Sequence, residues 1–186
     1  MDIKNRIIEL LNEYKSLSKT KYEPTYLDIC KYSGRRFEEI CSRILQFYFL
    51  PNNEHGLKTL LIESLFESIG YDYEYIDDNI DVKIEVNAEG KRLDILIINN
   101  DWVIGIENKI WANVYNPLEQ YSSMIEQINN NNFKIILTLH KIINKEELAK
   151  IKKYGFYILL YTDYINNIHK TLLVNISMKI INILFF

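Results

Sequence analysis

Residues 92–111 constrain the fold of this chain more than any other segment. They read RLDILIINNDWVIGIENKIW, which is two apolar runs joined by the polar residues 99–101. Each run is hydrophobic enough to form a buried strand, yet together they carry Asp94, Glu107 and Lys109. Because charged side chains are rarely buried unless they are paired or ligated, the segment predicts a hairpin with a charged cluster.

The register of the hairpin decides whether these three side chains meet. Asn100 and Asp101 both tolerate the positive φ of a tight two-residue loop. With that loop, Asp94 lies directly across from Glu107, and their Cβ atoms are about 4.5–5.5 Å apart. Lys109 shares their face because side chains alternate along a strand, and a slip of one residue would separate the cluster.

A cation is the partner that this cluster requires. Two carboxylates at such a distance repel each other unless a proton or a cation lies between them. One lysine does not neutralise two acids, and all-oxygen ligation suits Mg²⁺ or Mn²⁺. The alternative is a buried ion pair between Lys109 and one of the acids, which would serve the fold alone.

The hairpin motif resembles the core motif of the PD-(D/E)XK nuclease superfamily, in particular its uncharacterised bacterial members. An aspartate in one strand and the sequence Glu107-Asn108-Lys109 in the next match that motif. The sequence departs from it at Leu93, which stands in place of the proline.

Flanking segments extend the resemblance to about residues 35–165. Upstream, residues 39–45, and then residues 50–56, are similar to the first helix and the following loop of the superfamily. Downstream, residues 118–121 are similar to its Q-L-x-x-Y helix, although Pro117 stands where that helix usually has a glutamine.

The resemblance implies a fold and a chemistry. The fold is of the α/β class, with a restriction-endonuclease-like core whose mixed β-sheet, an antiparallel meander plus parallel strands, is flanked by helices. The chemistry is Mg²⁺-dependent hydrolysis of phosphodiester bonds in nucleic acid by a DNA endonuclease, in restriction or phage defence. Two alternatives stay open: an inactive nuclease-fold module that binds nucleic acid or a protein, and an interaction protein that assembles through an apolar tail.

The same resemblance assigns roles to the residues of the hairpin. It implies that Asp94 and Glu107 hold one or two Mg²⁺ or Mn²⁺ ions, together with the backbone carbonyl of Asn108. A bound metal lowers the pKa of water and neutralises the charge of the phosphate. Lys109 would orient the attacking water or stabilise the charge that develops on the phosphate.

Three further residues are site candidates by resemblance. Glu39, on the first core helix, is a candidate metal ligand, and its alternative is a place on a solvated helix face. Gln120 and Tyr121, on the downstream helix, are candidate substrate contacts. The alternative for Tyr121 is a core tyrosine on the apolar stripe of that helix.

Apolar periodicity and turn signals predict alternating elements along the chain. We expect helices over residues 2–17, 35–50, 55–69, 117–128 and 144–155, and from residue 162 or 163 onward; the expected strands are 79–88, 92–98, 102–111, 133–139 and 156–161. Gly70 ends a helix, Gly90 marks a turn, and Asn144 with Glu147 forms a capping box. An antiparallel meander followed by strand–helix–strand units predicts a mixed sheet with crossover helices.

The length of 186 residues favours one domain, residues 1–186. We expect an N-terminal helical extension (1–34), the core (35–165) and an apolar C-terminal helix (166–186). Residues 172–186 are too short and interrupted to predict a membrane span. They are expected to pack on the core or to form the interface of a homo-oligomer.

Composition sets the expected surroundings and partners. A net charge of −3 does not favour strong non-specific binding to nucleic acid, so basic groups that bind DNA would be local. The candidate groups are Lys145, Lys150, Lys152 and Lys153, and Arg35, Arg36 and Arg43. With two cysteines and no signal-peptide core at the N-terminus, we expect a cytoplasmic protein that acts on DNA and not on a membrane.

Overall fold

The computed structural model describes residues 6–7, 37–110 and 117–185, and their side chains as far as residue 174. By its internal contacts the chain divides into residues 1–33 and residues 34–186. Apart from Arg6 and Ile7, which are helical, the helix expected over residues 2–17 lies outside the described residues. The fold described below is that of residues 37–185.

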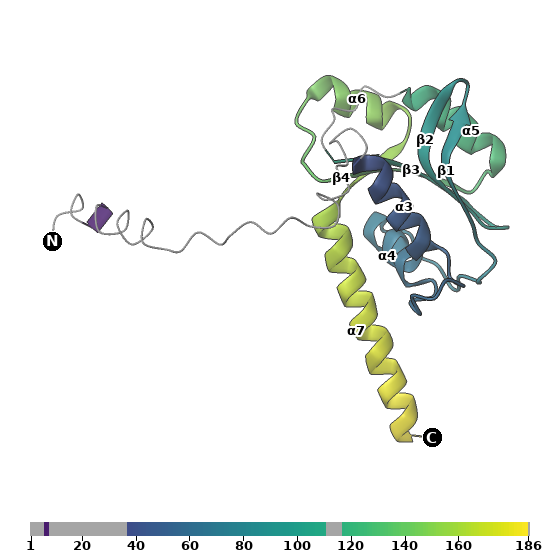
Figure 1. Ribbon diagram of the computed structural model, residues 1–186, viewed down its shortest axis with the longest axis vertical. Coiled ribbons are helices and arrows are strands. Elements are labelled where there is room, and N and C mark those ends of the chain that lie inside the picture. The colour runs from purple at the N-terminus through teal and green to yellow at the C-terminus, as the bar shows by residue number, and fades with distance from the viewer. Residues whose placement is uncertain (1–5, 8–36, 111–116, 186) are drawn as a thin grey trace. The chain divides into compact units, whose positions relative to one another are not determined.

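Five strands form one mixed sheet in the order β1-β2-β3-β4-β5 (Figure 1). They are β1 (Asp81–Ala88), β2 (Lys91–Ile98), β3 (Val103–Lys109), β4 (Asn132–Thr138) and β5 (Phe156–Leu160). The first three strands form an antiparallel meander, and β4 and β5 run parallel to β3. The predicted α/β fold, with a mixed sheet of an antiparallel meander plus parallel strands flanked by helices, is confirmed.

Five helices accompany the sheet: α3 (Phe37–Phe49), α4 (Leu60–Ile69), α5 (Leu118–Ile128), α6 (Lys145–Lys153) and α7 (Tyr161–Phe185). Helix α4 begins later than predicted because residues 51–59 form turns, in which the ring of His55 accepts the N–H of Leu57. Gly70 ends α4 in the left-handed conformation, and the side chain of Asn144 caps α6, as predicted. Helix α7 follows β5 directly at Tyr161, so no loop separates them.

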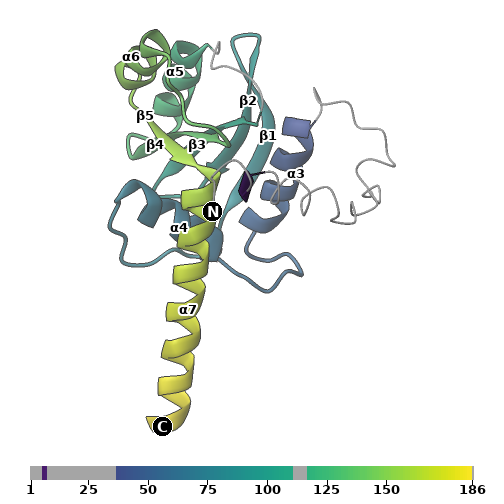
Figure 2. The ribbon, with the colours of Figure 1, turned by 90° about the vertical axis from the view of Figure 1, so that its left-hand side faces the viewer.

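The sheet separates two hydrophobic cores, one on each face. Helices α3, α4 and α7 lie on one side of the sheet, and α5 and α6 lie on the other (Figures 1 and 2). The first core packs against α3, α4 and α7 and includes Phe66 and Ile104. The second core packs against α5 and α6 and includes Leu118 and Ile125. The antiparallel hairpin β2–β3 lies between the two cores and contributes to both.

The register of the β2–β3 hairpin is the predicted one. Ile95 pairs with Ile106 and Ile98 pairs with Val103, which by extension places Asp94 across from Glu107. The turn that sets this register differs from the expected one in its backbone conformation, and the side chain of Asn99 stabilises it.

The turn is closed by Asn99. Its N–H donates to the carbonyl of Trp102 (3.0 Å), and its side-chain oxygen accepts the N–H of Asp101 (3.0 Å). Neither Asn100 nor Asp101 has the positive φ that we expected. The side chain of Asn99 therefore shapes the turn by a local hydrogen bond, in place of a left-handed backbone.

Strand β1 changes the face to which its side chains point halfway along its length. Val82 and Ile84 pack into the first core, whereas Val86 and Ala88 pack into the second. Even-numbered residues of a regular strand share one face, so the backbone turns over between Ile84 and Val86. Glu85 lies at this change with a φ of 50°, a backbone conformation that residues other than glycine rarely adopt.

Strand β2 makes the same change at Asp94. Leu93 packs into the second core and Ile95 into the first, although both are odd-numbered. The β1–β2 ladder pairs Ile84 with Ile95 and Val86 with Leu93, on either side of the change. Asp94 therefore lies at the position where the side chains of β2 change from one face of the sheet to the other.

The apolar C-terminal segment is helical, as predicted. It forms the end of α7, in which Leu173 and Val174 are 64% and 60% exposed. No helix in the described part of the chain is long and apolar enough to cross a membrane. A homo-oligomer interface on this segment stays a prediction.

Candidate active site

Asp94, in the middle of β2, lies near Glu107 and Lys109 in the last residues of β3, as the register predicted. The Nζ atom of Lys109 lies 2.9 Å from Oε1 of Glu107. Oδ2 of Asp94 accepts the N–H of Asn108 at 2.7 Å, across the two strands. Glu107 and Lys109 are only 2% and 8% exposed, whereas Asp94 is half-buried.

Helix α3 adds a third carboxylate, that of Glu38. Its Oε1 accepts the N–H of Ile110 at 2.8 Å, directly after β3 ends. Its Oε2 lies 3.9 Å from Nζ of Lys109. Three acids therefore surround one ammonium group.

Glu39, the candidate metal ligand of the sequence analysis, directly follows Glu38 on α3, and its role as a ligand stays a prediction. Glu39 lies outside the cluster, where its carboxylate pairs with Arg43 at 2.9 Å on the exposed side of α3. Successive helical residues point about 100° apart, so one position along the sequence moves a side chain to another face. Ser42 is buried and donates to the carbonyl of Glu38, but it lies four residues after Glu38 and three after Glu39, so spacing alone does not distinguish the two glutamates.

The electrostatics of the cluster favour an additional positive charge. Burial and the charge of Asp94 raise the pKa of Glu107 to about 8, against the attraction of Lys109. Burial also raises the pKa of Asp94, although the N–H of Asn108 and the charge of Lys109 lower it. Burial alone would lower the pKa of Lys109, but Glu107 outweighs it and the net shift is upward. Lys109 thus stays charged at neutral pH, and a proton or a cation must balance the remaining acids.

Comparison with known proteins agrees with the geometry. The sequence profile of the PD-(D/E)XK nuclease superfamily matches residues 27–181, which is most of the chain. The chain belongs to the PD-(D/E)XK nuclease superfamily. Asp94 and the sequence Glu107-Asn108-Lys109 lie within the matched residues, and their assignment to the motif of the superfamily stays a prediction.

No curated protein matches this superfamily member. Among solved structures, it is similar to the MspJI restriction endonuclease in complex with a 27-mer oligonucleotide, with 12% sequence identity and a TM-score of 0.31. The match covers 81% of this chain and 34% of that one, so this chain spans about a third of the length of the restriction endonuclease.

PD-(D/E)XK nucleases typically use divalent metals, and the donor set of this cluster fits such an ion. Asp94 and Glu107 offer carboxylate oxygens in a site that carries excess negative charge. Within the described residues, no three His, Cys, Asp or Glu side chains are grouped so that they would hold a metal by themselves. Mg²⁺ is commonly held by one or two carboxylates while it keeps several waters, so this set suffices for it.

Asn108 was predicted to contribute only its backbone carbonyl, but its side chain also makes hydrogen bonds. Its side chain is fully buried, and its Nδ2 donates to the carbonyl of Glu38 (3.2 Å) and to Oγ of Ser42 (3.1 Å). Its Oδ1 accepts the hydroxyl of Tyr161 at 2.7 Å. Sequence reasoning missed Tyr161 as a neighbour of the site. Whether the carbonyl of Asn108 binds a metal stays a prediction.

Tyr121 and Gln120 lie on α5, which packs on the second core. The hydroxyl of Tyr121 donates to the carbonyl of Arg92 at 2.5 Å, and the residue is 3% exposed. Burial and the charges of Glu107 and Asp94 raise its pKa, so it is close to the cluster. This is the placement of a core tyrosine. Gln120 is half-buried, and substrate contact by either residue stays a prediction.

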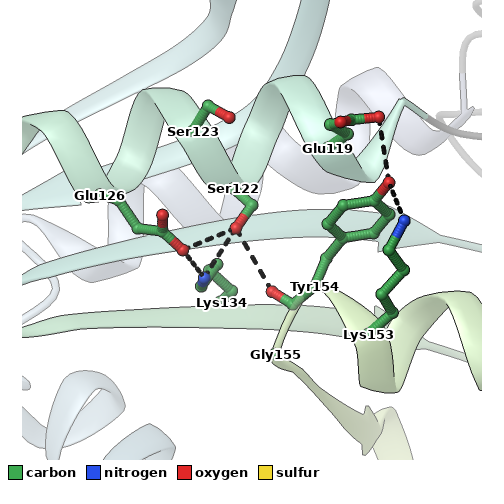
Figure 3. A pocket seen from close by; sticks show the side chains of 8 residues that line it. All are labelled: Glu119, Ser122, Ser123, Glu126, Lys134, Lys153, Tyr154 and Gly155. Atoms are coloured by element: carbon green, nitrogen blue, oxygen red, sulfur yellow. Dashed lines mark hydrogen bonds and ion pairs between the residues drawn. The ribbon is translucent and has the colours of Figure 1, made fainter.

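A second polar cluster lies between α5, β4 and the turn after α6 (Figure 3). Nζ of Lys134 donates to Oγ of Ser122 at 2.8 Å and to Oε1 of Glu126. Ser122 in turn donates to Glu126 at 2.8 Å, which closes a triangle at one side of a cavity of about 460 Å³. Because the charge of Lys134 is matched by Glu126, this cluster ties α5 to the sheet and lacks the charge imbalance of the Asp94 cluster.

Proposed function

We propose that this protein is a DNA endonuclease that hydrolyses phosphodiester bonds with the help of Mg²⁺ or Mn²⁺. The observation that carries the proposal is the intact set of Asp94, Glu107 and Lys109 in a chain of a nuclease superfamily. Unused buried charges are costly, so a chain that had lost the activity would be expected to lose them. Restriction of foreign DNA and defence against phage are the roles that such an activity would serve.

The metal is held by the carboxylates of Asp94 and Glu107 and by the backbone carbonyl of Asn108. When bound, a divalent cation lowers the pKa of water and offsets the negative charge of the phosphate. Its charge also replaces the proton that Glu107 would otherwise keep at neutral pH.

Lys109 acts as a fixed positive charge and not as a base. The acids around it raise its pKa, so it keeps its proton at neutral pH. Its contact with Glu107 directs the ammonium group toward the acids. From there it donates hydrogen bonds to the attacking water or to the phosphate oxygens, where negative charge increases during the reaction.

The decisive experiment is nicking of supercoiled plasmid DNA in the presence of Mg²⁺, by the wild-type protein and by Asp94→Asn and Lys109→Met. We expect wild-type cleavage that EDTA abolishes and that both variants lose. Lys134→Met is the matched control, because Lys134 is also a buried, glutamate-paired lysine of the sheet but lies outside the cluster. Cleavage by Lys109→Met at the wild-type rate would overturn the proposal.

The second candidate is a nuclease-fold module that binds nucleic acid without cleaving it. The observation that favours it is Pro117, which stands where the downstream helix usually has a glutamine and which directly precedes α5. For this candidate we expect wild-type protein that shifts DNA in a gel with Mg²⁺ and leaves it intact. The exposed lysines of α6 are then the first residues to replace.

A further inference from the structure

Tyr161 connects two parts of the site that are distant in the sequence. It is the first residue of α7, and its hydroxyl donates to Oδ1 of Asn108 on β3 at 2.7 Å. Burial raises the pKa of Tyr161, so the hydroxyl keeps its proton at neutral pH and remains a donor. The contact joins the end of β5 to the Glu-x-Lys strand.

The side-chain amide of Asn108, which binds Tyr161, also makes hydrogen bonds to α3. Its Nδ2 donates to the carbonyl of Glu38 and to Oγ of Ser42, and the hydroxyl of Ser42 also donates to the carbonyl of Glu38 at 2.9 Å. The amide can be oriented in only one way here, since a flipped amide would point its oxygen at the carbonyl of Glu38 and its nitrogen at the hydroxyl of Tyr161. The hydroxyl of Tyr161 thus fixes the group that holds the first turn of α3.

The first turn of α3 is where Glu38 joins the cluster. Its carboxylate accepts the N–H of Ile110 and lies beside Lys109. The N–H of Asn108 itself holds Asp94. Rotation of the Asn108 side chain would therefore release the first turn of α3, which carries Glu38, whereas the backbone contact to Asp94 does not depend on that side chain.

We propose that Tyr161 is a positioning residue: through the side chain of Asn108 it holds the first turn of α3, and so keeps Glu38 in place beside Lys109. The contact itself is independent of what the cluster does, and its effect on cleavage rests on the proposed nuclease function.

Tyr164 provides a matched control on the same helix. Its hydroxyl donates to the carbonyl of Leu61 at 2.8 Å, and it is 1% exposed, but it does not contact the Asn108 network. Tyr161→Phe and Tyr164→Phe each remove one buried hydrogen bond from the start of α7. A purely structural role of Tyr161 would make the two variants alike.

The first test uses the metal-free protein and does not depend on activity. We expect the amide of Ile110 to exchange with solvent about ten-fold faster in Tyr161→Phe than in Tyr164→Phe, because one net hydrogen bond is worth about a factor of ten. Equal exchange in the two variants would overturn the proposal, whether or not the wild-type protein cleaves DNA.

The second test measures plasmid cleavage and Mn²⁺ binding in a cycle with Glu38→Gln. We expect Tyr161→Phe to lower kcat about ten-fold with KM for DNA unchanged, and to weaken Mn²⁺ binding, while Tyr164→Phe does neither. In the Glu38→Gln background the effect of Tyr161→Phe should shrink at least threefold, since its target is already absent. Full additivity of the two changes would contradict a role through Glu38. A wild-type protein without cleavage would refute the nuclease function. The exchange result would then decide by itself whether Tyr161 is a positioning residue.

Discussion

Nζ of Lys109 and Oε1 of Glu107 are 2.9 Å apart on one strand, in a site where the two residues are 8% and 2% exposed. The pair is two residues apart in the sequence, so a regular strand points both side chains to the same face. Asp94 and Glu38 approach it from a second strand and from a helix, and they leave the cluster with more acids than one ammonium balances. The predictions below follow from this imbalance and from the packing around it.

The stability of the metal-free protein should fall as the pH rises from 4.5 toward 8. Folded Glu107 keeps its proton to a pKa of about 8, whereas its ordinary pKa is 4.5. Between these values the folded state binds more protons than the unfolded state, so raising the pH favours unfolding, by at most about 1.4 kcal/mol per pH unit. Urea unfolding in EDTA at several pH values measures the slope, and Glu107→Gln should flatten it. A slope that survives in this variant would assign the effect to other groups.

Two adjacent glutamates of α3 should differ sharply in their effect on metal binding. Glu38→Gln removes a charge that lies beside Lys109, and we expect Mn²⁺ affinity to fall about ten-fold or more, as removal of a supporting group at a metal site typically does. Glu39→Gln removes a charge from an exposed pair with Arg43 and should leave the affinity within about two-fold. Isothermal titration of the two variants checks both values, and the reverse order would show that Glu39 is the ligand after all.

Replacing Glu126 should destabilise the fold more than replacing Lys134. The side chain of Lys134 is 9% exposed and that of Glu126 is 54% exposed. Glu126→Gln leaves an enclosed ammonium without its counter-charge, which costs about 1–3 kcal/mol. Lys134→Met removes the charge and fills a similar volume, so it should cost less. Urea unfolding measures both changes; a larger loss for Lys134→Met would mean that the ion pair stabilises the protein on balance.

Gly105→Ala should destabilise the protein without touching a charged group. A Cβ atom at this position would lie 2.9 Å from Cγ1 of Ile125 and 3.2 Å from Cδ2 of Leu93, both in the second core. Overpacking of this kind typically costs about 1–3 kcal/mol, and Ile125→Val in the same chain should recover part of it by making room. Thermal unfolding of the single and double variants checks this. No recovery would indicate that the backbone of β3, and not α5, resists the change.

The hairpin was predictable because its information is local. The charges, the turn and the alternation of the strands all lie within residues 92–111, and together they place Asp94 opposite Glu107. The predicted conformation of the turn was wrong. The side-chain oxygen of Asn99 accepts a hydrogen bond from the N–H of Asp101, and this local bond competes with the left-handed backbone that asparagine also allows.

Contacts between distant segments were beyond the reach of the same reasoning. Glu38 and Glu39 are alike in the sequence, and only the packing of α3 against the sheet distinguishes them. Tyr161 is 53 positions from Asn108, and no motif links the two. The sequence thus predicts which acids one hairpin brings together, but not which residues of other elements hold them.

The change of face in β1 at Glu85 and in β2 at Asp94 affects how the protein unfolds. The first half of β1 belongs to one core and the second half to the other, so neither core can melt without removing support from the same pair of strands. The two layers should therefore unfold in a single cooperative transition, with Asp94 at the point that couples them. Heating should then abolish the native arrangement of the acids and the fold at the same temperature, with no partly melted form that keeps the cluster intact.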